Sequence, residues 1–381
     1  MKSWPAQVGD SAAAIDTPAL VIDLDAMDRN LATMAAFARA HGMRLRPHAK
    51  MHKCAAIARL QIDAGAVGVC VQKVSEAEAL ADAGVADIFI SNEVIAEAKL
   101  ARVAALAGRI QLAIAVDSAL GVQRLADALK AAGTGLDVFV EIDVGQGRCG
   151  VAPAAAGALA HQVVSHGVPG RGMRFAGLHA YHGRAQHLRN AAERAAEIRH
   201  AVALVRVAQA SITSAGISCP LVTGAGTGSF VNEAASAVYG ELQPGSYLFM
   251  DADYAANEAA PHAPRFEHAL FVKSQVMSRG ASHAVVDAGH QSHAIDSGLP
   301  RVWAPTAGAA VPSFTNGGDE HGILLPQAGA ALPELGATVW LIPGHCDPTV
   351  NLHAHLVGVR GGLDAGRVET IWAVNARGCV F

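Results

Sequence analysis

Short β-branched runs alternate with alanine- and leucine-rich stretches along the first 250 residues of the chain. Strands that alternate with helices pair in parallel, because a parallel connection has to cross back over the sheet. The runs cover residues 43–50, 67–72, 86–92, 111–117, 136–143, 175–182, 220–226 and 241–250. Eight units of this kind predict an α/β fold, a (β/α)8 TIM barrel, whereas an open sheet would have about five to seven strands.

After residue 256 the pattern changes. Strand-like runs such as "ALFVKSQVMS", "ATVWLIPG" and "RVETIWAV" follow one another through Gly, Pro and Asp turns, with no long helical pattern between them. The sequence therefore predicts a barrel over residues 26–255 and a C-terminal all-β domain over residues 256–381. Residues 1–25 are expected to join the β-rich domain.

Charge and cysteine content exclude several classes of protein. The 381-residue chain has a net charge of −4, and basic residues cluster only in "MRLRPHAKMHK" at 43–53, so a nucleic-acid partner is not expected. The sequence has no apolar segment of membrane-spanning length and no signal-peptide pattern. The six cysteines are scattered without paired spacing, which favours reduced thiols and a cytoplasmic location.

A lysine stands at the end of the first predicted barrel strand. In such barrels the active site lies at the carboxyl ends of the strands, where Lys50, Gln72 and His182 fall. Lys50 is placed to act as a nucleophilic amine, and burial beside other cations is expected to lower its pKa. A solvated lysine beside a loop is the alternative. Lys53 is expected on the following helix.

A glycine-rich turn, "GAGTGS" at 224–229, follows the seventh predicted strand. Its glycines would let the backbone approach an anion, and Thr227 and Ser229 can donate hydroxyl hydrogen bonds. Phosphate sites recur in the loops after strands seven and eight of this architecture, although the segment could also be only a turn. A phosphate anchor opposite a strand-end lysine points to pyridoxal 5′-phosphate (PLP). The expected contacts of the phosphate side are Thr223, Gly224, Gly226, Thr227, Gly228, Ser246 and Tyr247.

Two further segments carry candidate chemistry. In "EIDVGQGRCG", Arg148 suits a phenolate oxygen or a substrate carboxylate, with a surface Arg–Asp pair as the alternative. In "LIPGHCDPTVNLH", His345 and Asp347 would share one side of an extended segment and could bind Mn²⁺, Co²⁺, Mg²⁺ or Zn²⁺. A histidine and an aspartate two residues apart are common in proteins, so this spacing alone is weak evidence for a metal site. Supporting contacts are expected from "GGDEHGI", which supplies Asp319, Glu320 and His321.

Many stretches together resemble the D-threonine aldolase family, within the alanine-racemase-like, fold-type III group of PLP enzymes. They include "TPALVIDLDAMDRN", "RPHAKMHK", "QKVSEAEALADAGVADI", "EIDVGQGRCGV", "AYHGRAQH", "GAGTGS", "ELQPGSYLFMDADY" and "PGHCDPTVNLH". The resemblance implies a barrel of the alanine racemase type, with PLP on Lys50 and a divalent metal, manganese above all, on His345 and Asp347. It also implies a homodimer and a small-molecule substrate, a D-3-hydroxy-amino acid.

The family's reaction breaks the Cα–Cβ bond of that substrate and releases glycine and an aldehyde. The resemblance suggests His187, or water at the metal, as the base, with His182 as its rival. It also places Gln72, Arg148 and Tyr181 at the cofactor. Departures from the family pattern at His179, His290, Gln291 and His293 are expected to change the rim or the domain interface, and with it the preferred substrate side chain.

Other reactions start from the same cofactor. A 3-hydroxy-D-aspartate aldolase shares most of these segments, and a D-serine or 3-hydroxyaspartate dehydratase would expel the β-hydroxyl and yield a keto acid and ammonia. A racemase would need no metal. A non-enzymatic PLP carrier is disfavoured, because a carrier has no use for the predicted metal pair in an appended β-rich domain.

Overall fold

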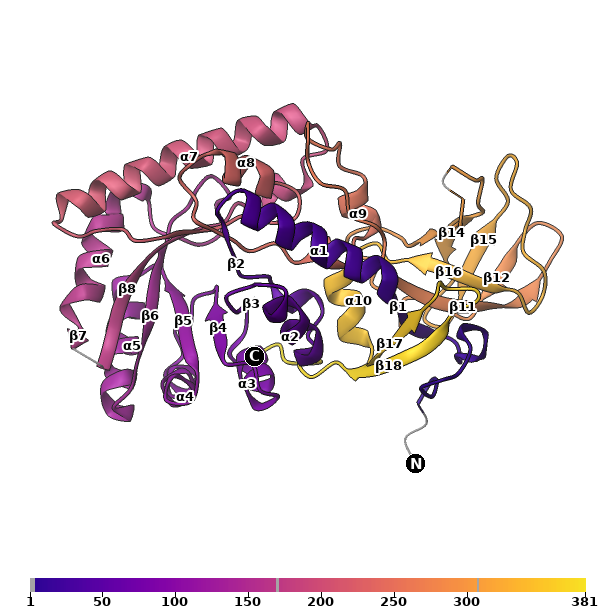
Figure 1. Cartoon of the computed structure of the whole chain (residues 1–381), viewed down its shortest axis with the longest axis horizontal. Coiled ribbons are helices and arrows are strands. Elements are labelled where there is room, and N and C mark those ends of the chain that lie inside the picture. Colours follow the sequence, from indigo (N-terminus) through magenta and orange to yellow (C-terminus); the bar gives the residue numbers. More distant parts are fainter. Residues whose placement is uncertain (1–3, 169–170, 307) are drawn as a thin grey trace.

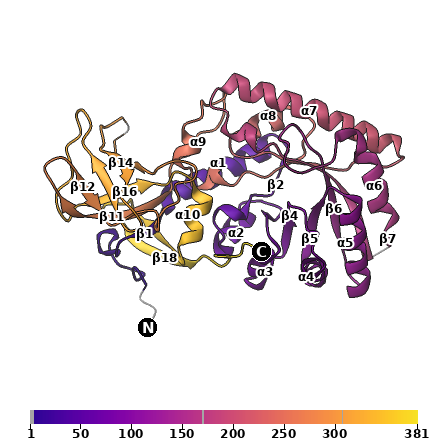
Figure 2. The same cartoon turned by 180° about the vertical axis from the view of Figure 1, so that it is seen from behind.

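Parallel strands lie side by side in one lobe of the computed structural model, which describes residues 4–168, 171–306 and 308–381 (Figures 1 and 2). The hydrogen-bonded order is β2-β10-β9-β8-β6-β5-β4-β3. The two ends of this path meet where the amide of Cys70 donates to the carbonyl of Pro47 at 2.8 Å, which closes the barrel. The strands are β2 (Arg44–Leu45), β3 (Val69–Val71), β4 (Asp87–Ile90), β5 (Gln111–Val116), β6 (Gly135–Glu141), β8 (Arg171–Ala180), β9 (Val222–Gly224) and β10 (Glu241–Leu242), with β7 (Gly167–Val168) paired to β8. The predicted barrel is confirmed.

The first and last barrel strands are much shorter than the sequence predicts. Each ends before a proline, Pro47 or Pro244, which has no backbone N–H to donate to a neighbouring strand. The chain beyond each proline instead forms a 3₁₀ turn, η2 (Ala49–Met51) or η5 (Ser246–Leu248). The prediction that Lys50 ends a strand is therefore wrong: Lys50 lies in η2.

Helices cover the outside of the barrel. They are α1 (Leu24–Ala40), α2 (Ala55–Asp63), α3 (Val74–Asp82), α4 (Glu97–Ala107), α5 (Ala119–Ala132), α6 (Ala156–Ser165), α7 (Ala191–Ser214) and α8 (Phe230–Ala235), with the turn η3 (Pro153–Ala155). The turn η1 (Ala12–Ala14) lies in the N-terminal segment, and η4 (Arg184–His187) follows β8. Several of them begin at a side-chain cap. The carboxylate of Asp23 accepts from the amides of Asp25 and Ala26, and the side chain of Asn190 does the same at the start of α7.

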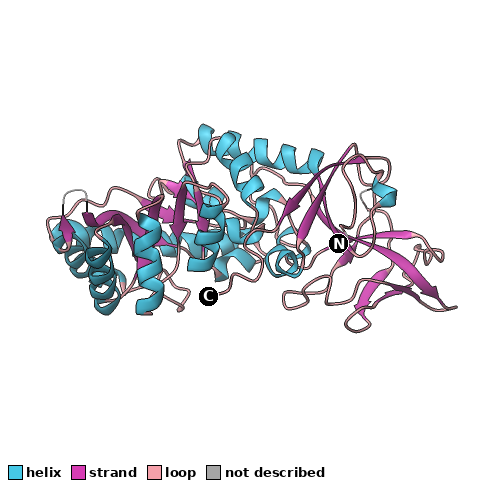
Figure 3. Ribbon diagram, turned by 90° about the horizontal axis from the view of Figure 1, so that it is seen from below, coloured by secondary structure: helices cyan, strands magenta, loops and turns pink. Residues whose placement is uncertain are grey.

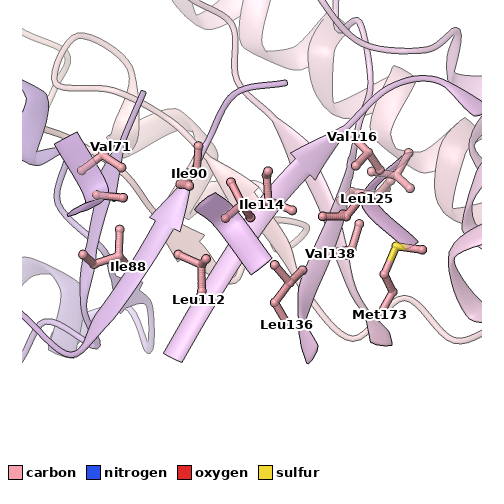
Figure 4. Close-up of a cluster of buried hydrophobic side chains, with 14 of the residues drawn as sticks. Val71, Ile88, Ile90, Leu112, Ile114, Val116, Leu125, Leu136, Val138 and Met173 are labelled. Carbon is pink, nitrogen blue, oxygen red and sulfur yellow. The ribbon is translucent and has the colours of Figure 1, made fainter. Parts of the chain in front are cut away.

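The outward-facing and inward-facing side chains of the barrel strands form separate clusters. Outward-facing side chains alternate along β4 to β6 and pack against the helices, as Ile88, Ile90, Ile114 and Val138 do in Figure 4. A smaller inward-facing cluster, Cys70, Phe89, Ala113, Ala115 and Phe139, fills part of the interior. Buried polar side chains, among them Arg46, Thr223 and Glu241, occupy other positions inside the barrel.

The second lobe is built mainly from antiparallel strands (Figure 3). They are β11 (Leu270–Arg279), β12 (Ala284–Val286), β13 (Arg301–Val302), β14 (Ser313–Asn316), β15 (Gly322–Leu325), β16 (Thr338–Ile342), β17 (His355–Arg360) and β18 (Arg367–Ala373). The N-terminal strand β1 (Ala19–Asp23) lies between β11 and β17 in the same sheet. We propose that residues 1–25 and 256–381 form one domain.

Short helices lie where the lobes meet. α9 (Ala252–Ala255) follows the last barrel turn, and α10 (Cys346–Leu352) precedes β17. The contacts between α10 and η2 bring the segment after β16 against the turn that carries Lys50. Among the described residues, no helix combines the length and apolar character that a membrane crossing requires.

Candidate active site

A cavity of about 570 Å³ opens between the lobes at the carboxyl ends of the barrel strands. Its size falls in the range of small-molecule and cofactor sites. The residues predicted from the sequence that line it are Lys50, Gln72, Arg148, Tyr181, His187, Gly226, Thr227, Ser246, His345 and Asp347. Others that line it, and that sequence reasoning did not assign to the site, include Ser91, Arg184, Gln243 and Tyr254. His48, Gln146 and Gly245 line it as well.

Lys50 faces the second lobe. Its Nζ atom lies 3.2 Å from Oδ2 of Asp347. Attraction to that carboxylate raises the pKa of Lys50 against the opposing effect of burial, so the expected lowering of the Lys50 pKa is wrong. The resemblance to the aldolase family implies that Lys50 and the His345–Asp347 pair share one site, but it does not predict this direct contact.

His345 and Asp347 lie side by side, although the segment is not extended. His345 is the N-cap of α10, and its Nε2 atom is 3.6 Å from Oδ1 of Asp347. Cys346 points away, with its Sγ atom 3.5 Å from the carbonyl of Met250. Burial would raise the pKa of Asp347, but Lys50 and His345 outweigh it and hold the pKa at about 2.

This pair fits a divalent cation. Oδ1 of Asp347 is buried and has no hydrogen-bond partner among the described residues, which leaves its lone pairs available to a metal. No larger cluster of three histidine, cysteine or acidic side chains suited to a metal occurs in the described part of the chain. A cation held by His345 and Asp347 would therefore keep several positions for water or substrate.

The residue that orients His345 is not one that the sequence suggested. Nδ1 of His345 lies 2.8 Å from Oδ2 of Asp251, a fully buried carboxylate just before α9. The hypothesis that Asp319, Glu320 and His321 support the metal pair is wrong for His345, because Asp251 holds its Nδ1 atom. Asp319 instead lies 2.6 Å from Nε2 of His290. The segment around Asp251 reads in the sequence as a linker between domains.

The two candidate bases differ in position. His187, in η4, lines the cavity, and its Nδ1 atom lies 2.6 Å from Oδ2 of Asp253. His182 is buried outside the cavity lining, with its Nε2 atom 3.0 Å from Oε1 of Glu197. Its Nδ1 atom accepts the amide of Ala185 at 3.4 Å. Because both nitrogens of His182 have protein partners, the geometry favours His187 as the base.

Only some of the residues that were predicted to contact the phosphate line the cavity. Gly226, Thr227 and Ser246 line the cavity, and Oγ1 of Thr227 accepts the amide of Tyr247 at 2.9 Å, which joins the two loops. The Thr227 hydroxyl keeps its own hydrogen for a ligand. Ser229, however, donates to Oε1 of Glu233 at 2.7 Å and is fully buried, so its expected role as a phosphate donor is wrong.

Several residues expected at the cofactor lie just outside the cavity lining. Thr223 lies inside the barrel, where its hydroxyl donates to Oε1 of Glu241 at 2.8 Å. The hydroxyl of the fully buried Tyr247 accepts from Gln61 at 3.2 Å. Gly224 and Gly228 lie behind the lining as well, and a Cβ atom at Gly228 would come within 2.5 Å of the carbonyl oxygen of Gln186. These residues shape the loops that surround the cavity.

Arg148 and Tyr181 form one wall. The guanidinium carbon of Arg148 lies 5.8 Å from the centre of the Tyr181 ring. Burial raises the pKa of Tyr181, so its hydroxyl keeps its proton. Nε2 of Gln72 is 2.9 Å from Nε2 of His48, and both side chains line the same cavity.

The floor of the cavity carries a buried acid–histidine group. Nδ1 of His179 lies 2.8 Å from Oε2 of Glu141, and its Nε2 atom lies 3.2 Å from Oε1 of Gln243. Glu93 is a third member of this group: burial and the neighbouring Glu141 carboxylate raise its pKa to about 8.

Among the residues that depart from the family pattern, His179 lines the cavity. The described cavity lining does not include His290, Gln291 or His293.

The fold and the cavity define an alanine-racemase-like barrel enzyme with an added β-rich lobe. Residues 22–253 match the family model for the alanine racemase N-terminal domain, and residues 269–359 match that for a putative serine dehydratase domain. The chain belongs to the D-threonine aldolase family of this class. It is 47% identical over 98% of its length to a D-threonine aldolase of Arthrobacter sp, 96% of which is covered.

Two further comparisons agree with this assignment. The chain is 41% identical to a 3-hydroxy-D-aspartate aldolase of Paracoccus denitrificans, over 98% of this chain and 95% of that protein. The crystal structure of D-threonine aldolase from Filomicrobium marinum superimposes with a TM-score of 0.93 at 47% identity, covering 99% of this chain and 100% of that one.

Proposed function

We propose that this protein cleaves D-3-hydroxy-amino acids to glycine and an aldehyde, as a lyase that uses PLP and a divalent metal. The observation that carries the proposal is the meeting of Lys50 with the His345–Asp347 pair in one cavity. Because they share one cavity, a cofactor on Lys50 and a metal on the pair could act on the same substrate. The aldolases among its relatives support the same reaction.

The cavity lining fits PLP. Lys50 supplies the amine that would hold the aldehyde, and Thr227 and Ser246 supply hydroxyl donors for the phosphate on the opposite side. Arg148 stands where a permanently charged donor could meet the phenolic oxygen, beside Tyr181. When bound, PLP supplies an electron sink for the pair released as the Cα–Cβ bond breaks.

His187 moves the proton. Because its Nδ1 atom lies against the Asp253 carboxylate, that nitrogen carries the hydrogen, and Nε2 keeps a lone pair for the substrate's β-hydroxyl proton. Loss of that proton lets the β-carbon become the carbonyl of the departing aldehyde. General base help of this kind contributes roughly 10²–10⁴ in rate.

His345 and Asp347 would hold the metal. A bound divalent cation supplies a Lewis acid that polarises the β-hydroxyl oxygen. One imidazole and one carboxylate, with the remaining positions open, suit Mn²⁺, and Co²⁺, Mg²⁺ or Zn²⁺ are the alternatives. We also propose a cytoplasmic homodimer. Free cysteines throughout the described chain support a reducing compartment, and the barrel class supports the dimer.

A dehydratase is the competing function, because the same cavity could expel the β-hydroxyl instead of releasing an aldehyde. Aldol cleavage needs a base on the hydroxyl proton, whereas elimination needs an acid on the hydroxyl oxygen. The Asp253 contact of His187 leaves Nε2 as an acceptor, which favours cleavage. Incubation with a panel of D-3-hydroxy-amino acids, with and without chelator, tests the proposal. Glycine and aldehyde support it, and 2-oxo acid with ammonia contradicts it.

A further inference from the structure

One short segment between the lobes contacts both histidines of the proposed site. α9 begins after Asp251, whose Oδ1 atom accepts the amide of Tyr254 at 2.9 Å. Asp251 and Asp253 are both buried. In Figure 1, α9 lies between the barrel and the β-rich lobe.

Asp251 contacts the metal histidine. Its Oδ2 atom lies 2.8 Å from Nδ1 of His345 and also accepts the amide of Cys346 at 3.1 Å. This arrangement places the hydrogen of His345 on Nδ1 and leaves Nε2 facing Asp347. A carboxylate behind a ligating imidazole fixes the ring and makes it a stronger donor.

Asp253 contacts the proposed base. Its Oδ2 atom lies 2.6 Å from Nδ1 of His187, and its Oδ1 atom accepts from the guanidinium of Arg189. Burial would raise the pKa of Asp253, but its bonds to Arg189 and His187 outweigh burial and lower it. Asp253 is therefore an ionised acceptor with a fixed orientation.

The segment is tied to both loops that carry these histidines. The amides of Ala252 and Asp253 donate to the carbonyls of Pro343 and Gly344 at 3.0 and 3.1 Å, next to His345. Nδ2 of Asn257 donates to the carbonyl of Gln186 at 2.8 Å, next to His187.

Tyr254 completes the connection. Its ring centre lies 5.6 Å from that of His187 and 6.2 Å from that of His345, and its side chain lines the cavity. His187 and His345 thus lie near the same tyrosine ring, and each is held by a different carboxylate, His187 by Asp253 and His345 by Asp251.

We propose that Asp251 and Asp253 are separate positioning residues, Asp251 for the metal-binding imidazole of His345 and Asp253 for the proton-accepting imidazole of His187. The segment 251–254 sets the separation of metal and base. This inference rests on the proposed function for the roles of the two histidines. Each carboxylate accepts a hydrogen bond from Nδ1 of its histidine and so fixes which nitrogen of that imidazole carries the hydrogen.

The test separates the two supports. In Asp251→Asn, the affinity for Mn²⁺ should fall about 10- to 100-fold, because the amide cannot support the ligand as a carboxylate does. Its kcat at saturating Mn²⁺ should stay within a few-fold of wild type. In Asp253→Asn, the amide can donate to Nδ1 of His187 and move the hydrogen to Nε2, so kcat should fall about 10²-fold or more while Mn²⁺ affinity and KM hold.

The holoenzyme would be assayed with D-threonine, and Mn²⁺ binding would be titrated by calorimetry. Asp63→Asn, on an exposed carboxylate at the end of α2, is the matched control and should change neither quantity. If either site variant lowers both quantities together, or if either variant leaves its own quantity unchanged, the proposal is overturned.

A second measurement uses only the wild-type protein, so it does not require that any variant folds. Nitrogen-resolved NMR of histidine-labelled wild type loaded with diamagnetic Zn²⁺ should show His187 and His345 with their hydrogens on Nδ1, and the opposite tautomers would overturn the proposal. If the wild type cleaves no D-3-hydroxy-amino acid, the proposed function fails. The Mn²⁺ titration and the tautomers would still decide the inference.

Discussion

Nζ of Lys50 lies 3.2 Å from Oδ2 of Asp347, so a lysine from the barrel and a carboxylate from the β-rich lobe meet in one cavity. The contact joins the residue proposed to hold the cofactor to a residue proposed to hold the metal. Neither lobe contains both groups. The site therefore depends on how α9 and α10 bring the lobes together.

Replacing Lys50 by alanine should abolish the visible absorbance band of the lysine-bound cofactor and reduce kcat to background, because no other amine replaces the covalent attachment. Lys130→Ala, on an exposed residue of α5, is the matched control and should keep both the band and the activity. Absorbance spectra of purified protein check this. A band that survives in Lys50→Ala would reject the assignment.

Gly228→Ala should weaken PLP binding. A Cβ atom there would lie 2.5 Å from the carbonyl oxygen of Gln186, so the loop that includes Gly226 and Thr227 has to shift. Overpacking of this kind lowers the free energy of unfolding by about 1–3 kcal/mol. At Gly108, after α4, an added Cβ would meet nothing closer than 3.2 Å, and Gly108→Ala should behave as wild type. Cofactor titration and thermal unfolding distinguish the two, and equal PLP affinities would contradict the expectation.

Lys53→Met should destabilise the protein by about 3–5 kcal/mol, because it leaves the Glu76 carboxylate buried without its counter-ion. Nζ of Lys53 lies 2.6 Å from Oε1 of Glu76, and both side chains are buried. The double variant Lys53→Met/Glu76→Gln should recover much of this loss. Denaturant unfolding measures both. A loss below about 1 kcal/mol for the single variant would show that the pair matters little.

The stability of the fold should fall as the pH rises through the titration of Glu93. Its pKa is raised by burial and by Glu141 from 4.5 to about 8, so the folded protein keeps a proton that the unfolded chain releases. The stabilisation is fully present below about pH 4.5 and is lost as the pH approaches 8. Both Glu93 oxygens are buried, and a proton on Glu93 lets it donate to the neighbouring Glu141 carboxylate.

Glu93→Gln keeps the size and shape of the side chain but removes the group that ionises. Above pH 8 this variant should exceed the wild type in free energy of unfolding by about 2 kcal/mol, after solvent screening, and the difference should vanish toward pH 5. Glu97→Gln, on an exposed residue of α4, is the control and should follow the wild type. Unfolding curves at several pH values check this. Parallel pH profiles for wild type and Glu93→Gln would contradict the prediction.

Much of the fold follows from patterns that the sequence displays. Alternating β-branched runs and Ala-rich helices predict the barrel, because each unit is defined locally. The same topology gathers Lys50, Gln72 and Tyr181 at one rim, since the carboxyl ends of parallel barrel strands lie together.

The remaining features depend on contacts between distant segments. Pro47 and Pro244 stop the first and last strands early, so Lys50 lies in a 3₁₀ turn. Asp251 and Asp253 lie in a segment too short for any helical period, and their partners, His345 and His187, are far away in the chain. No local pattern could show that this apparent linker supports both histidines.

Product analysis with PLP-loaded protein, D-threonine and Mn²⁺ tests the proposed cleavage most directly. Glycine and acetaldehyde are expected in equal amounts, with the reaction stopped by chelator and restored by added Mn²⁺. Formation of 2-oxobutanoate and ammonia, or cleavage that persists in full after the metal is removed, would contradict it.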